Sequence, residues 1–569
     1  MPDGREAHGV GEAPRPRDLV TAMVVFLLSA SLFAGLVHFM DNTNINTRNG
    51  SHIAVQLRPW VEGAHDRRLF FANLLYYPVV GWMLRLLRET VFGPIWTRMA
   101  LVNSVFGGLA LGCLFAHARL LRFPVWAAMS MVLFQLGCGF FLFGSITSED
   151  IMPAYAMLMI SVTLFAMSER SGSFATLVLS AAAFVLSWLF HWTLVCNLLP
   201  ACVLAFAAGR GPPGSRAVRA AVFFASVLLL LVVACLAVKG HRGPAGVIAK
   251  AIWPGKGLDT GFAGFAAIKI NLIFVGISQY LATGKLVAHA EYLRDNLLPT
   301  TGKLLFMVLC GISLVKRVAG AWDDGAWRAT GILLVSVFAC GELFNLYVQP
   351  QDPQFQLAPM AWLAFGWGWL CVRVVQAAPR VRRLVAAVLV VAALIPFAWN
   401  FDSKSRTRGL DSYWVRAVGN LDARFDRSRT LFVFAGHGDL IVWMDVMGGW
   451  KLKDYLRPAC ESRDPWKFRV FLLSAELILF PGRTPDESAA AVVDYLQAAV
   501  KCGLKVVVGG VWTRPRSQFL DLFLMFNDAD RTKAAAMYDA LSVNFEGVLV
   551  SEDPNFVFYE LRRRNQRPQ

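Results

Sequence analysis

Long apolar runs, each close to the length of one bilayer crossing, recur along the chain as far as residue 400. An α-helix needs about 20 mostly apolar residues to cross the hydrocarbon core of a membrane. The 569 residues are 56% hydrophobic and only 17% charged, and the mean hydropathy is +0.49. A soluble protein of this length would need a more polar surface. The sequence therefore predicts a polytopic α-helical membrane protein.

The apolar runs predict about eleven membrane spans within residues 19–400. The expected spans are 19–40, 100–118, 124–145, 151–167, 174–190, 192–208, 218–238, 300–315, 329–347, 354–375 and 384–399. The segment 264–283 contains Lys269 and Asn271, so we expect a re-entrant or interfacial piece there. The polar residues 1–18 form an N-terminal tail that we expect in the cytoplasm.

The net charge of +16 would suggest nucleic acid as a partner in a soluble protein. Here much of the basic charge lies in short loops beside apolar runs, which is the topology bias of membrane proteins. We therefore expect no nucleic acid partner. Placing these short loops in the cytoplasm puts loops 41–98 and 239–303 on the outer face. Those outer loops are basic too, which fits either an anionic ligand or contacts with anionic lipid.

The composition changes near Phe401, and residues 401–569 are expected to form a soluble α/β domain outside the cytoplasm. Helices and strands alternate there, as in "DESAAAVVDYLQAAVKCGLKVVVGG", and "FEGVLVSEDPNFVFYEL" is typical of a closing strand pair. Eight of the ten cysteines lie in apolar runs. Only Cys460 and Cys502 fall in this tail, and they can pair if it faces an oxidising compartment. High Ala, Arg and Trp usage is typical of a GC-rich bacterial genome, so the bacterial inner membrane is the expected location.

Three acidic residues stand at the expected outer borders of spans. Asp41 follows the first span, and Glu149 and Asp150 precede the fourth. A single acidic residue at such a border is usually interfacial, and a carboxylate before Pro153 also suits a helix N-terminus. Because a charge in hydrocarbon is costly, acidic residues near this depth are otherwise paired or functional.

The order of these features resembles the GT-C superfamily of polyprenyl-phosphate-sugar-dependent glycosyltransferases, which includes protein O-mannosyltransferases and lipid A aminoarabinose transferases. The shared order is a first span, an acidic residue, a long outer loop with an interfacial helix, two spans and a second acidic motif. The stretches that carry the resemblance are "LLYYPVVGWMLRLLRETVFGP" and "VLSAAAFVLSWLFHWTLVCNLLPACVLA". Departures exist: Tyr76-Tyr77-Pro78 stands where the family usually has His-Pro-Pro, and Asn42 follows Asp41 where many members have Glu.

The resemblance implies an inverting glycosyltransferase that moves a sugar from a polyprenyl-phosphate donor to a lipid, glycan or protein acceptor. Asp41 is the implied general base, because an acceptor hydroxyl needs a carboxylate to take its proton. Glu149 and Asp150 would line the same cavity and bind the acceptor or a divalent metal ion. The candidates for substrate binding are His191 at the end of a helix and, for the lipid phosphate, the basic residues Arg58, Lys239, Arg242 and Lys250.

A polar insertion, "YVQPQDPQFQL", separates two late spans on the expected outer face. In GT-C proteins a late outer loop often helps to cover the active site, so the resemblance implies that Gln351, Asp352 and Gln354 contact sugar or acceptor. A rigid hairpin between helices explains the two prolines equally well.

Two other functions fit a polytopic chain with these residues. A transporter or flippase would use the carboxylates to bind a coupling ion, but would favour acidic residues within spans and internal repeats, and neither is evident. A catalytically silent assembly protein would use the spans only to anchor the tail.

Overall fold

The computed structural model describes residues 16–43, 49–63, 75–191, 212–237, 267–281, 297–347, 355–435, 468–509, 515–521, 528–553 and 556–564, together with eight single positions between 194 and 461. The chain divides into two compact units, residues 1–408 and 409–569. The expected domain boundary at 401 falls inside a helix that runs from Ile395 to Ser405.

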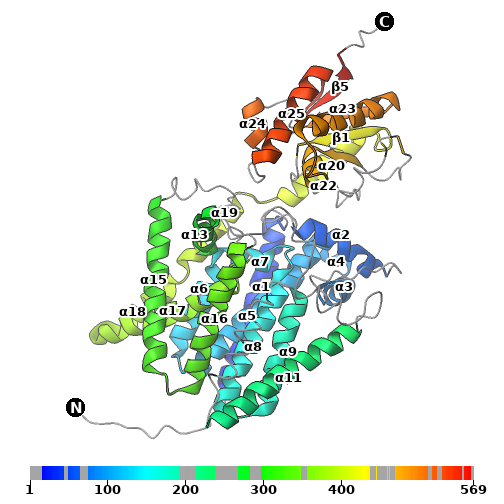
Figure 1. The fold of residues 1–569 in the computed structure, drawn as a ribbon. Helices are drawn as coiled ribbons and strands as arrows, with labels where there is room; N and C mark the ends of the chain where they lie inside the picture. The colour runs from blue at the N-terminus through cyan, green and yellow to red at the C-terminus, as the bar shows by residue number, and fades with distance from the viewer. Residues whose placement is uncertain are drawn as a thin grey trace, which may run out of the picture. The chain divides into compact units, whose positions relative to one another are not determined.

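The first unit is a bundle of helices (Figure 1). Its helices are α1 (Pro16–Met40), α2 (Asn49–Glu62), α3 (Tyr76–Leu86), α4 (Glu89–Phe92), α5 (Ile95–Leu120), α6 (Val125–Gly137), α7 (Gly139–Ile146), α8 (Ile151–Ser171), α9 (Phe174–Phe190), α11 (Pro213–Ala237), α13 (Ala267–Leu281), α15 (Leu297–Gly320), α16 (Gly325–Tyr347), α17 (Trp362–Ala377), α18 (Arg382–Ala392) and α19 (Ile395–Ser405), with short 3₁₀ turns at Pro359–Ala361 and Pro379–Val381.

Within the described residues, seven helical segments are long and apolar enough to cross a membrane, or eight if α6 and α7 form one bent span. The predicted polytopic helical class is confirmed. The count differs from the expected eleven because α9 and α17, with 17 and 16 residues, are shorter than a full crossing, and the expected span 192–208 lies largely outside the described residues.

The third expected span, 124–145, is broken rather than straight. Helices α6 and α7 meet at Cys138 with a bend of 69°. The backbone of α19 approaches closely here, since a Cβ on Gly137 would lie 2.5 Å from the Phe397 nitrogen. The side-chain amide of Asn400 donates to the Gly137 and Leu281 carbonyls, both at 2.8 Å. This buried amide therefore joins the middle of α19 to the last residues of α6 and α13.

Glycines on α5 bring α1 unusually close to it. A Cβ on Gly108 would lie 2.7 Å from the Phe26 carbonyl oxygen, and one on Gly112 would lie 2.9 Å from that of Ala22. Small residues at a helix crossing allow such close backbone packing inside a membrane. The position of Asp41, at the end of α1, is therefore set by α5.

The expected outer loop, residues 41–98, contains α2, which packs against α3. Arg85 Nε of α3 donates to the Val61 carbonyl at 3.1 Å. Helix α3 has 11 residues, and one face of it, including Tyr76 and Val80, is buried. Its length agrees with the predicted interfacial helix rather than a span.

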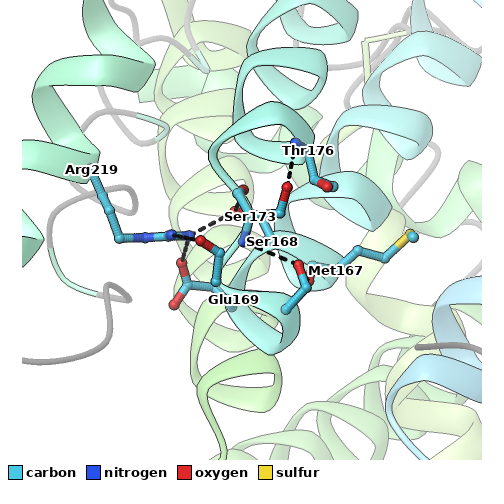
Figure 2. Close-up of polar contacts among 8 residues, drawn as sticks. Met167, Ser168, Glu169, Ser173, Thr176 and Arg219 are labelled. Atoms are coloured by element: carbon cyan, nitrogen blue, oxygen red, sulfur yellow. Dashed lines mark hydrogen bonds and ion pairs between the residues drawn. The ribbon is translucent and has the colours of Figure 1, made fainter. Parts of the chain in front are cut away.

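A buried ion pair fixes α11 to the hairpin formed by α8 and α9. Figure 2 shows Arg219 of α11 reaching the last turn of α8. Its Nη2 donates to Glu169 Oε1 at 2.8 Å and to Ser168 Oγ at 2.7 Å, and its Nη1 donates to the Gly172 carbonyl at 3.3 Å. Ser168 Oγ in turn donates to the Ser173 carbonyl at 3.1 Å. The arginine thus supports both the end of α8 and the start of α9.

The second unit is an α/β domain built on one five-stranded sheet of order β2-β1-β3-β5-β4. The strands β1, β2 and β3 are parallel, and β5 pairs antiparallel with both β3 and β4. The elements are α20 (Leu410–Arg424), β1 (Thr430–Phe434), β2 (Arg469–Leu472), α22 (Leu473–Leu479), α23 (Pro485–Lys501), β3 (Lys505–Gly509), α24 (Arg516–Asp521), α25 (Asp528–Asn544), β4 (Phe545–Asp553) and β5 (Phe556–Arg563). The predicted α/β class and closing strand pair are confirmed.

A capping box starts α23, where Thr484 and Glu487 each accept a hydrogen bond from the other's backbone N–H. At the other end of this helix, Cys502 forms a disulfide with Cys460, with Cα atoms 5.7 Å apart.

We predict that Arg219→Met lowers the free energy of unfolding by about 3–5 kcal/mol, because it removes the guanidinium that pairs with the buried Glu169 carboxylate. The measurement is the thermal unfolding midpoint of the purified protein in detergent. Arg406→Gln is the matched control, because Arg406 and Asp402 form a pair whose side chains are 76% and 63% exposed. Its midpoint should stay close to wild type. Equal midpoints for the two variants would contradict the role assigned to Arg219.

Candidate functional site

Asp41 ends α1 in a left-handed backbone conformation, with φ at +46°. Its N–H donates to the Val37 carbonyl at 3.1 Å, which closes the last helical turn. Asp and Asn adopt this conformation more readily than most residues. A strained backbone held by its surroundings is frequent at functional sites. The backbone therefore changes from helix to loop at Asp41 itself.

The half-buried Asp41 lines a cavity of about 410 Å³. The opposite wall comes from α4 and the start of α5, including Gly93 and Thr97. His38 and Thr43 also line the cavity, so its polar groups gather around the end of α1. Its volume lies in the range of about 300–1,000 Å³ typical of small-molecule sites.

The two acidic motifs are joined by hydrogen bonds, although they are far apart in the sequence. The Thr43 carbonyl accepts from the Ser148 N–H at 2.8 Å and from Ser148 Oγ at 3.1 Å. Ser148 immediately precedes Glu149 and is fully buried. The loop after α1 and the loop before α8 therefore form one structure.

Asn103 of α5 supports the loop that carries Glu149 and Asp150. Its side-chain amide donates to the Thr147 carbonyl at 2.7 Å and also to the Glu149 carbonyl. Asn103 is fully buried, so both bonds are shielded from water. The same helix that positions Asp41 by close packing thus positions Glu149 by hydrogen bonding.

The side chains of Glu149 and Asp150 are buried, with 1% and 6% of their surface exposed. Neither is among the residues that line the Asp41 cavity, which differs from the expectation of one shared lining. The difference arises because Asn103 and Thr43 hold their loop inside the bundle. The loops that carry the two acidic motifs are hydrogen-bonded to each other, but Asp41 lines the cavity whereas Glu149 and Asp150 are buried inside the bundle.

Asp150 lies in a buried cluster with His191 and two tyrosines. The His191 Nε2 is 3.5 Å from Asp150 Oδ1, and both side chains are buried. Burial raises the pKa of the Tyr76 hydroxyl well above its ordinary value, and the Asp150 carboxylate raises it further. The same two causes raise the pKa of Tyr77. Both tyrosines are therefore neutral hydrogen-bond donors at physiological pH.

Several residues near the acidic loops carry weak sequence signals and were not predicted as site residues. Asn42 Nδ2 donates to Thr407 Oγ1 at 2.6 Å and to its carbonyl at 3.0 Å, which joins the first motif to the end of the membrane unit. Lys404 lies one turn earlier, is 3% exposed, and has its Nζ 5.3 Å from the Phe143 ring centroid. A lysine just after a span is ordinary in a sequence, so only its burial distinguishes it.

Of the remaining predicted site residues, the structure describes only Arg58. Arg58 lies exposed on α2, with its Nε 3.8 Å from Glu62 Oε1, and does not line the Asp41 cavity. The other predicted residues lie outside the described residues: Lys239, Arg242, Lys250, Gln351, Asp352 and Gln354.

Within the described part of the chain, no three His, Cys, Asp or Glu side chains gather into a group that could hold a metal ion. The divalent metal ion that the family resemblance implied is not tested by this arrangement. The described groups best suited to it, Asp41, Glu149 and Asp150, do not form one ligand set.

No protein-family model and no curated protein sequence matches the chain. Two structures of oligosaccharyltransferase from Archaeoglobus fulgidus, one of them named AglB, superpose on 96% of the chain and on 75% and 74% of their own, with TM-scores of 0.51 and 0.50 and identities of 11% and 12%. The chain has the GT-C fold. The predicted resemblance to that superfamily is thereby confirmed at the level of fold.

A third similar structure is that of ArnT from Cupriavidus metallidurans in the apo state. It covers 95% of this chain and 98% of its own, at 14% identity and a TM-score of 0.44, which is too low to support the fold assignment. The AglB structure contains an inhibitory peptide and a dolichol-phosphate, and the other oligosaccharyltransferase structure has an acceptor peptide tethered by a disulfide bond.

We predict that Asn103→Ala lowers the free energy of unfolding by about 1–3 kcal/mol, because it removes the donor of two buried carbonyls. Ser148→Ala is the matched comparison. It removes only the hydroxyl bond to Thr43 and keeps the backbone bond, so its cost should be about 0.5–1.5 kcal/mol. Thermal unfolding of both variants in detergent measures the difference. A larger cost for Ser148→Ala would contradict the assignment of Asn103 as the main support of this loop.

Proposed function

We propose that this chain is a membrane glycosyltransferase that transfers a sugar from a polyprenyl-phosphate donor to an acceptor outside the cytoplasm, with inversion. The observation that carries the proposal is the joining of the two acidic loops by Thr43 and Ser148 beside the cavity lined by Asp41. The GT-C fold agrees with this function, since AglB is a structural neighbour whose structure was obtained in complex with a dolichol-phosphate.

Asp41 is the proposed general base. The sugar on a polyprenyl phosphate already carries a good leaving group, so the chemistry requires removal of a proton from the acceptor hydroxyl as it attacks the anomeric carbon. Asp41 is half-buried at the cavity wall, where a carboxylate can reach a bound acceptor. The polyprenyl phosphate leaves with the electrons of the broken C–O bond, and the proton passes to Asp41.

The buried cluster around Asp150 is proposed to position the site rather than to react. The Asp150 carboxylate faces His191 at 3.5 Å, and the neutral hydroxyls of Tyr76 and Tyr77 lie within its electrostatic range. Because Asp150 directly follows Glu149, this cluster supports the second loop in addition to the bonds from Asn103.

The second unit is proposed to lie outside the cytoplasm of a bacterial inner membrane. The disulfide between Cys460 and Cys502 supports this orientation, because structural disulfides persist mainly in oxidising compartments. The domain would then lie on the face where the acceptor is bound, and a role in acceptor binding or regulation follows from that location.

We predict that Asp41→Asn lowers donor consumption by about 10²–10⁴-fold, the usual contribution of a general base. Asn also tolerates the left-handed backbone at this position, so the variant should keep the wild-type fold. The assay offers a panel of polyprenyl-phosphate sugars, with and without divalent metal and with candidate acceptors, and follows loss of the donor. Asp402→Asn is the matched control, because Asp402 is exposed on α19 and is predicted to leave the rate unchanged.

The wild-type protein should consume at least one donor, and that donor names the sugar. The proposal is contradicted if Asp41→Asn and wild type consume that donor equally. It also fails if wild type neither binds nor consumes any donor of the panel, an outcome that favours a transporter or an anchor.

The orientation of the second unit yields a separate prediction. In intact bacterial spheroplasts, a membrane-impermeant maleimide should label neither Cys460 nor Cys502 before reduction and should label both after it, because both residues are exposed but disulfide-bonded. Cys460→Ala is the control, since it frees Cys502 for labelling without reductant. Labelling of that variant only after the membrane is permeabilised would place the domain in the cytoplasm.

A further inference from the structure

A second cavity, of about 530 Å³, lies at the end of the bundle opposite Asp41. It forms where the start of α6 meets the end of α17 and the start of α18. Arg119 Nε in the last turn of α5 is 2.8 Å from Asp18 Oδ1 in the first turn of α1. Because α6 begins five residues after α5 ends at Leu120, the cavity belongs to the end where α1 begins.

The cavity is lined by both apolar and cationic side chains. Apolar side chains provide most of its wall, and one amide and two guanidinium groups provide the polar part. The residues that define this chemistry are Trp126, Val372, Val375, Gln376, Arg382 and Arg383. A ligand that fits must therefore carry both an apolar portion and a negative charge.

Among the residues that the structure describes, no carboxylate forms an ion pair with these two arginines. The sequence contains no Asp or Glu within residues 90–148 or 353–401, the two stretches that supply all of the lining residues. Arg382 and Arg383 are exposed and form no ion pair with any of the residues that the structure describes. Two adjacent guanidinium groups without a partner carboxylate suit a phosphate, which accepts paired hydrogen bonds from arginine.

The helix that follows the two arginines presents apolar side chains to its surroundings. Leu384, Val388 and Val391 of α18 are 65%, 57% and 66% exposed, and no residue of α18 is buried. The helix belongs to a segment long and apolar enough to cross the membrane. Its exposed face is thus expected to contact lipid chains, which places the arginines at the level of the phospholipid headgroups.

We propose that this cavity binds one anionic glycerophospholipid of the surrounding bilayer. Its phosphate lies between Arg382 and Arg383, and its glycerol and the first part of an acyl chain lie against Trp126 and the valines of α17. A soluble phosphate compound would leave this apolar wall exposed to water, which is unfavourable. The site is separate from the Asp41 cavity and does not depend on the proposed transferase activity.

Native mass spectrometry of the full-length protein tests the proposal, with lipid adducts titrated by phosphatidylglycerol and by phosphatidylcholine of equal chain length. Phosphatidylglycerol should bind wild type more tightly than phosphatidylcholine does, and R382Q/R383Q should weaken it by about tenfold or more. R373Q/R380Q is the matched control. This variant also removes two positive charges from the same segment, but neither residue lines the cavity. Its affinity for phosphatidylglycerol should therefore stay within about twofold of wild type.

Trp126 supplies an independent readout that does not require a charge change. Dibrominated phosphatidylglycerol should quench part of the tryptophan fluorescence, and that part should be missing in Trp126→Phe. If both double variants lost affinity for phosphatidylglycerol equally, the effect would be general charge attraction, and the proposed site would be wrong. Displacement of the lipid by millimolar inorganic phosphate, or equal quenching by dibrominated phosphatidylcholine, would also overturn it.

Discussion

The carbonyl oxygen of Thr43 holds together the two parts of the chain on which the proposed site depends. It accepts two hydrogen bonds from Ser148, one from the backbone and one from the side chain. Both groups are buried, and a buried carbonyl that lost its donors would incur a desolvation cost of about 1–3 kcal/mol. The loop that carries Asp41 and the loop that carries Glu149 are therefore expected to move as one unit. The separate surroundings of the carboxylates follow from this arrangement, since one loop faces the cavity and the other is held inside the bundle.

Helix α5 serves as the common support of both loops. Its glycines allow α1 to pack against its backbone, and its Asn103 donates to two carbonyls of the second loop. On the far side, Asn42 reaches Thr407 at the end of the membrane unit. The region around Asp41 is thus held by contacts with three parts of the chain, which are α5, Ser148 and Thr407. Such preorganisation is what a catalytic carboxylate requires, because its orientation need not be established during the reaction.

Much of the fold was predictable because bilayer thickness and helix geometry limit the choices. The apolar runs at 19–40 and 151–167, for example, predict helices that the structure confirms as α1 and α8. The break between α6 and α7 was not predictable, because it depends on the approach of α19 to Gly137 from more than two hundred residues away in the sequence. Strand β2 was missed because its four residues are too short to show an alternating pattern.

The candidate site was predicted only in part. Asp41, Glu149 and Asp150 are identifiable because carboxylates at span borders are conspicuous in an apolar chain. The partners that position their loops are Asn103, Ser148 and Thr407, which are ordinary polar residues in the sequence and become informative only through their contacts. The pairing of His191 with Asp150 likewise requires the three-dimensional arrangement of α8 and α9.

Photo-crosslinking tests most directly whether the donor binds beside Asp41. A polyprenyl-phosphate sugar analogue with a photoreactive group next to the phosphate would be crosslinked to the protein in nanodiscs and mapped by peptide mass spectrometry. The account predicts labels within residues 37–43 and 91–97, which line the cavity, and their loss when unlabelled donor competes. Labels that donor displaces from other segments, with none in these two, would contradict it.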